Sequence, residues 1–173
     1  MIGVKTQQMN SLIKFNIDTL SKILFLIEPL ENVWSKKNIN FNNETIGRHI
    51  RHIIDFYLCF KNHTDTDYID YDSRTRNNKI ETDIYFARKQ FDEIIHFLKN
   101  KNLNDKNINV KMNSSVCNHK LHSTLYRELM HVADHAIHHA NLVQIIIKNE
   151  FPNLDQKCNF YSPSTIDSKR CAQ

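Results

Sequence analysis

Apolar residues recur at every third or fourth position in four long segments of the chain, the spacing that places them on one face of an α-helix. The segments cover approximately residues 6–28, 44–61, 78–100 and 124–149. Helices of this kind are stable when their apolar faces are buried against one another. The pattern therefore predicts an all-α protein, a four-helix bundle that forms a single domain over residues 1–173.

The polar segments between these helices add little regular structure. Apolar and polar residues alternate from Ile108 to Met112, which permits a small β-hairpin before the last helix. The chain after about residue 151 shows no periodicity, so we expect an irregular tail there. Glycine occurs only twice, and this scarcity favours helices over glycine-rich phosphate-binding loops and bulged sheets.

The charges and cysteines indicate a cytoplasmic protein without nucleic-acid or membrane partners. The net charge of +4 comes from 23 basic and 19 acidic residues that are spread along the chain, so no basic face is apparent. The first ten residues lack the apolar segment of a signal peptide, and no run of about 18 apolar residues is present. Four scattered cysteines without a C-x-x-C motif are expected to be free thiols: Cys59, Cys117, Cys158 and Cys171.

The last predicted helix contains four histidines within nine residues, which are His131, His135, His138 and His139. On a helical wheel His135 and His139 fall inside the apolar arc, His131 lies on its edge and His138 lies outside it. Neutral imidazole is a common metal ligand, and two imidazoles one turn apart can hold one ion. We therefore predict that His135 and His139 are metal ligands. The glutamate of an H-E-x-x-H protease motif is absent.

Glu128 lies on the same inward face, two turns before this pair. A buried carboxylate is costly unless it has a partner. We expect Glu128 either to orient a ligand histidine or to act as an acid or base in catalysis.

A third ligand is expected from the second helix, where His49 and His52 lie one turn apart. The helical wheel places His49 nearer the middle of the apolar face and His52 near its edge, with Asp55 one turn beyond. A single inward histidine is usually a hydrogen-bonded core residue. Inward pairs on two helices favour a metal site over a polar core lined by histidines.

These motifs resemble the DinB-like (DinB/YfiT) metalloprotein family over nearly the whole chain. Residues 45–55, TIGRHIRHIID, are similar to its second-helix segment, and the match places the ligand on His52. Residues 127–139 are similar to its last core helix, in which an H-x-x-x-H supplies two ligands. Three further segments resemble a bacterial subgroup of the family, at residues 71–76, 80–83 and 162–165.

The resemblance implies an up-down-down-up bundle with a three-histidine site that keeps open coordination positions for Zn, Ni or Fe(II). Characterised members are transferases that use low-molecular-weight thiols. The expected function is therefore that of a metal-dependent transferase or hydrolase, which acts on a small molecule with a thiol cosubstrate. The alternative is a non-catalytic, stress-related protein with a structural metal. An exposed apolar face of the bundle would permit a homodimer.

Several other polar residues have two interpretations. Arg74 and Arg76 either clamp a substrate carboxylate or form ion pairs on a surface loop. Glu81 and Asp83 are expected to stabilise the start of the third helix. Asn42 or Asn43 is expected to cap the second helix.

Overall fold

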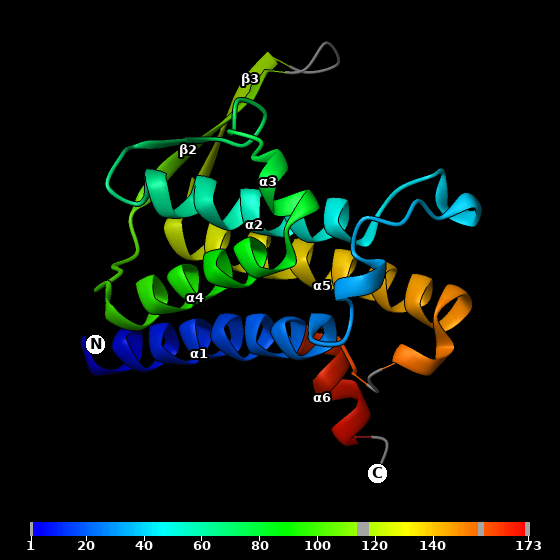
Figure 1. The fold of residues 1–173 in the computed structure, drawn as a ribbon. Coiled ribbons are helices and arrows are strands. Elements are labelled where there is room, and N and C mark those ends of the chain that lie inside the picture. The colour runs from blue at the N-terminus through cyan, green and yellow to red at the C-terminus, as the bar shows by residue number, and fades with distance from the viewer. Residues whose placement is uncertain (1, 114–117, 156–157, 172–173) are drawn as a thin grey trace.

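The computed structural model describes residues 2–113, 118–155 and 158–171 and combines helices with a small sheet (Figure 1). Four long helices pack side by side: α1 (Ile2–Ile27), α2 (Ile46–His63), α4 (Ile84–Asn100) and α5 (Leu125–Glu150). The shorter helical elements are α3 (Asn78–Thr82), α6 (Pro163–Cys171) and 3-10 helices at Glu31–Val33, Ile39–Phe41 and Pro152–Leu154. The four periodic segments of the sequence are thus helical.

The all-α assignment is wrong, because the chain also forms a three-stranded mixed sheet. The strands are β1 (Tyr68–Asp70), β2 (Asn107–Asn113) and β3 (Asn118–Thr124). β2 and β3 form the antiparallel hairpin that the alternation permitted, and β1 pairs with β2 in parallel. The sheet lies beside α2, on the side away from α1 (Figure 1). β1 has only three residues, so the alternation of apolar and polar positions that indicates a strand cannot be recognised in its sequence.

Two helix boundaries differ from the prediction because other side chains provide the caps. The third predicted helix is broken between α3 and α4 at Asp83, whose extended backbone (φ −131°) lets its carboxylate accept from Phe86 N at 2.9 Å. Thr45 caps α2 by accepting from Arg48 N at 3.0 Å. The prediction of Asn42 or Asn43 as this cap is wrong, because both adopt left-handed backbone conformations in the preceding turn.

The tail is more regular than expected. Residues 163–171 form α6, and Pro152 begins a short 3-10 helix, so the prediction of an irregular tail is wrong over these stretches. Phe160 is buried, and its carbonyl accepts from Asn141 Nδ2 of α5 at 3.2 Å. A short helix anchored in this way gives little sequence signal, because tertiary contacts stabilise it rather than its own periodicity.

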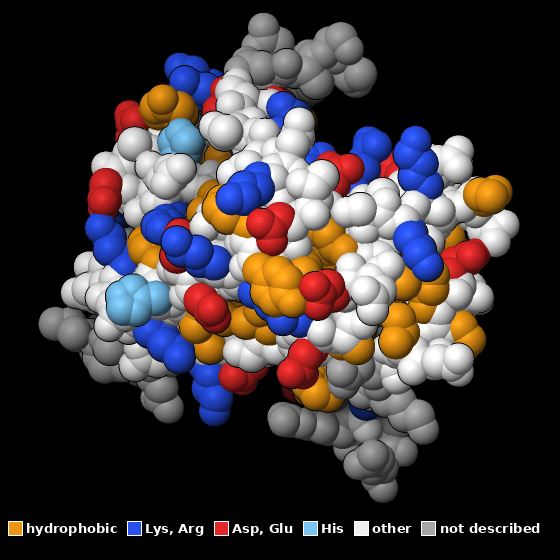
Figure 2. Space-filling view, in the orientation of Figure 1, with side chains coloured by type: hydrophobic (Ala, Val, Ile, Leu, Met, Phe, Trp, Pro, Cys, Tyr) orange, Lys and Arg blue, Asp and Glu red, His pale blue; other side chains and the backbone are white. Residues whose placement is uncertain are grey.

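The visible face in Figure 2 carries acidic, basic and apolar side chains intermixed. Among the described residues, each helix is too short or too polar to cross a lipid bilayer.

Gly47, in the first turn of α2, lies where three segments meet. Its N–H donates to the Trp34 carbonyl at 3.0 Å, and the Trp34 indole donates to the Ile80 carbonyl at 3.3 Å. A Cβ at position 47 would overlap the Glu81 carbonyl and lie 2.8 Å from Trp34 Nε1. Only glycine therefore allows α2 to approach α3 so closely.

We expect Gly47→Ala to lower the free energy of unfolding by about 1–3 kcal/mol, because the backbone of α3 must move away. Urea denaturation would measure this change. Asn62→Ala, at an exposed position of the same helix, is the control and should change stability by less than about 0.5 kcal/mol. Equal stabilities of the two variants would contradict the proposed close contact.

Candidate metal centre

The described chain brings three histidines together between α2 and α5. His52, His135 and His139 each offer a ring nitrogen, and the three atoms lie within 4.8 Å of one another. The ring centroids are 4.8 Å apart for His52 and His135, 4.5 Å for His52 and His139, and 4.8 Å for His135 and His139. These are the three predicted ligand residues, and they lie close enough together to bind a metal ion.

The local sequence explains this convergence. His135 and His139 are four residues apart, so they stack on one face of α5, and that face packs against α2. His52 lies on the edge of the apolar face of α2, from which its ring reaches both partners. His138 is exposed, as the helical wheel predicted.

One nitrogen of the cluster has no hydrogen-bond partner although it is buried. His135 Nε2 is shielded from solvent, and the His135 ring stacks on Phe56 with 4.1 Å between ring centroids. A buried polar atom without a partner costs free energy. A metal ion bound to this nitrogen would remove that cost, so the residues present fit a metal site.

The electrostatics of the cluster keep all three rings neutral near pH 7. Burial, assisted by neighbouring imidazoles and by Arg74, lowers the pKa of His52 to about 4. Burial and the nearby His131 lower the pKa of His135 to about 4, and burial with His52 lowers that of His139 to about 3. Metal binding requires deprotonated imidazole, so no proton need be lost at neutral pH.

His49, the residue that the helical wheel favoured, contacts the cluster from outside. His49 Nδ1 lies 3.2 Å from His139 Nδ1, and His49 Nε2 lies 3.2 Å from Glu44 Oε2. If His139 binds a metal through Nε2, its Nδ1–H donates to His49 Nδ1, and His49 Nε2–H then donates to the carboxylate. Such a chain fixes ring orientation and tautomer in metal sites. Sequence reasoning missed the role of Glu44, because Glu44 precedes the Thr45 cap of α2, and helical spacing does not indicate its contact with His49.

Arg74 occupies the open side of His52. Its Nη2 lies 3.1 Å from His52 Nδ1, Nη1 donates to the Tyr71 carbonyl at 2.6 Å, and the guanidinium lies 4.5 Å from the Phe56 ring centroid. Because arginine only donates, His52 Nδ1 must accept. Metal binding at either nitrogen of His52 therefore requires the guanidinium to leave Nδ1. Arg74 is half-buried against the cluster, so its interpretation as a surface ion pair is wrong.

The predicted acidic residues lie apart from the three histidines. Glu128 is buried on the inward face, as expected, but its carboxylate accepts from Ser123 Oγ at 2.6 Å, and no hydrogen bond links it to a cluster histidine in the described chain. Arg51 forms ion pairs with Asp55 at 2.9 Å and with Glu81 at 3.0 Å. Glu81 lies in the first turn of α3, as expected, and Asn77 provides the cap of that helix.

The histidine cluster opens onto a cavity of about 270 Å³. Its lining comprises Glu44, Arg48, His49, Arg51, His52, Arg74, Arg76 and His139. Four arginines face one carboxylate there, so the lining carries excess positive charge. A cavity of this composition favours anions.

In comparisons with known proteins, no family model, no curated protein and no solved structure matches the chain. The family resemblance of the sequence motifs therefore stays a prediction. Function is inferred from the geometry and chemistry of the site.

The lowered histidine pKa values predict how the stability of the metal-free protein depends on pH. Unfolded histidines bind protons near pH 6.5, whereas His52 and His135 in the fold bind them only near pH 4. The free energy of unfolding should therefore fall as the pH falls from 6.5 to 4, by up to about 1.4 kcal/mol per pH unit for each such histidine.

Urea denaturation at several pH values would measure this slope. His135→Gln should reduce it more than His138→Gln, which removes an exposed ring outside the cluster. A wild-type stability that stays constant across this range would show that the rings are not held neutral.

Proposed function

We propose that this chain is a divalent-metal-dependent enzyme, a transferase or hydrolase that acts on a small anionic molecule together with a thiol cosubstrate. The observation that carries the proposal is the cluster of His52, His135 and His139 beside an arginine-lined cavity. The resemblance of residues 45–55 and 127–139 to DinB-like proteins supports the same chemistry.

Three histidines leave coordination positions free in any of the common metal geometries. Imidazole nitrogen suits Zn, Ni or Fe(II), and three protein ligands with an open position are typical of catalytic rather than structural sites. A bound divalent ion would hold a thiol as its nucleophilic thiolate at neutral pH. Asp55 is not part of the group of close ligand atoms, and its Oδ2 pairs with Arg51, which favours the open site over a closed one.

The arginines of the cavity favour a substrate with a carboxylate or phosphate group. Arg51 is already paired with Asp55 and Glu81. Arg48 is exposed and pairs with Glu44 at 3.6 Å, Arg76 is exposed, and Arg74 lies against His52. A guanidinium can hold such a group through two parallel hydrogen bonds. An anion bound here would lie directly beside the histidine nitrogens.

The first test is elemental analysis of purified wild-type protein beside His135→Ala and His138→Ala. We expect about one equivalent of Zn, Ni or Fe in the wild type and in His138→Ala, and loss of the metal in His135→Ala. The two substitutions differ only in whether the ring belongs to the cluster. Absence of metal from all three proteins after reconstitution would remove the proposal.

The hydrogen-bond chain behind His139 gives a separate prediction. Glu44→Ala should weaken metal binding about 10- to 100-fold, because His49 loses the acceptor that fixes its tautomer. Glu44→Gln, which keeps one acceptor oxygen, should have a smaller effect. Competition with a chromophoric chelator would measure the affinities, with the exposed Glu28→Gln as control. Unchanged affinity in Glu44→Ala would show that the chain does not support the metal.

Catalysis itself is tested with metal-replete protein, small thiols and small electrophiles. We expect thiol consumption that requires metal and that is faster with electrophiles bearing a carboxylate than with neutral ones. Failure to turn over any thiol–electrophile pair, combined with a large loss of thermal stability on chelation, would instead establish a structural metal.

A further inference from the structure

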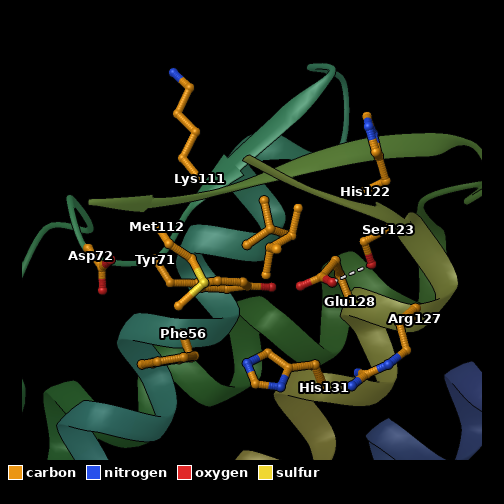
Figure 3. A pocket seen from close by; sticks show the side chains of 12 residues that line it. Phe56, Tyr71, Asp72, Lys111, Met112, His122, Ser123, Arg127, Glu128 and His131 are labelled. Atoms are coloured by element: carbon orange, nitrogen blue, oxygen red, sulfur yellow. Dashed lines mark hydrogen bonds between the residues drawn. The ribbon is translucent and has the colours of Figure 1, made fainter. Parts of the chain in front are cut away.

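A second and larger cavity, of about 470 Å³, lies between the sheet and the helices (Figure 3). Its walls come from β2, β3, α2, α5 and the loop after β1. The lining includes Phe56, Tyr71, Val110, Met112, Leu121 and Glu128. The volume is that of an ordinary small-molecule site. The sheet forms one side, and its Leu121 side chain is 48% exposed although apolar.

Two polar groups point toward each other inside this cavity, whose walls combine apolar side chains with polar ones. Figure 3 shows the Tyr71 hydroxyl directed at the Glu128 carboxylate, which Ser123 holds from the other side. Tyr71 is 8% exposed and Glu128 is 6% exposed. The Tyr71 hydroxyl makes no hydrogen bond of standard geometry. Burial and the Glu128 charge raise the pKa of Tyr71, so its hydroxyl stays protonated.

Among the described residues, no Lys, Arg or His forms an ion pair with Glu128. Arg127, His122 and His131 also line the cavity, but none of them lies within ion-pair distance of this carboxylate. The Lys111 side chain points away from the cavity (Figure 3), and its Nζ lies 3.6 Å from the Tyr68 ring centroid. Glu128 lies in the first turn of α5, where the helix dipole offsets part of its desolvation cost. A buried carboxylate without an ion pair nevertheless favours a ligand of opposite sign.

We propose that this cavity binds a primary ammonium group carried on an apolar body. The ammonium donates to the Glu128 oxygen that Ser123 leaves free and to the Tyr71 hydroxyl oxygen, while the Tyr71 proton turns to the carboxylate. The apolar body covers Val110, Met112 and Leu121. This site is separate from the arginine-lined cavity, which selects the opposite charge, and its ligand does not depend on a metal.

Isothermal titration of the purified protein with 2-phenylethylamine and with 2-phenylethanol tests the proposal, because the two probes have nearly the same shape and differ in charge. We expect the amine to bind at least about tenfold more tightly than the alcohol, the usual effect of hydrogen bonds to a charged group. Glu128→Gln should abolish that preference. Asp72→Asn, which removes an exposed carboxylate from the rim, should preserve it.

Two further variants make the outcome unambiguous. Tyr71→Phe should weaken amine binding several-fold even if Glu128→Gln proves poorly folded. His139→Ala should leave amine binding unchanged, which separates this site from the metal centre. Equal affinities for amine and alcohol, no binding of the amine, or amine binding that survives in folded Glu128→Gln would each overturn the proposal.

Discussion

The contact between α2 and α5 determines most of what this protein can do. Each helix presents an apolar face to the other, and imidazole rings from both are enclosed in that contact. Apolar packing fixes the two backbones and thereby the spacing of the half-buried rings. His135 Nε2 is shielded from solvent, and the protein alone provides no hydrogen-bond partner for it.

The same packing explains the charges around the cluster. Burial keeps the rings neutral, as the lowered pKa values of His52 and His139 indicate. Charged groups are therefore located at the periphery, with Glu44 behind His49 and the arginines at the cavity mouth. On the other side of Phe56 the second cavity has a balanced lining, with Lys111 and Arg127 against Asp72 and Glu128. The two cavities thus differ in charge balance while they share one helix pair.

Hydrophobic periodicity and motif spacing predict the features that depend on helical spacing. The four long helices and the stacked pair His135 and His139 follow from residues three and four apart. The wheel alone favoured His49 over His52, whereas the motif match selected the residue that lies in the cluster. His49 nevertheless contacts His139, so the wheel identified a neighbour of the site.

The parts that sequence reasoning missed are set by contacts between distant segments. β1 is defined by its pairing with β2, about forty residues later, and a loop-closing contact of this kind leaves no local pattern. The positions of Arg74 against His52 and of Glu44 against His49 are likewise tertiary. Glu128 was recognised as an inward carboxylate, but its surroundings depend on the sheet, which the prediction of an all-α fold lacked.

The position of Arg74 would link the proposed binding of a metal ion to the proposed binding of an anion. The guanidinium contacts His52 Nδ1 and lies at the same time within the arginine-lined cavity. A metal ion at His52 must displace it, and an anion in the cavity would attract it outward. Each ligand would then lower the free-energy cost of binding the other, and by thermodynamic reciprocity the two affinities would rise by the same factor. One arginine would thereby make the binding of an anionic substrate and of the metal cooperative, without any movement of the helices.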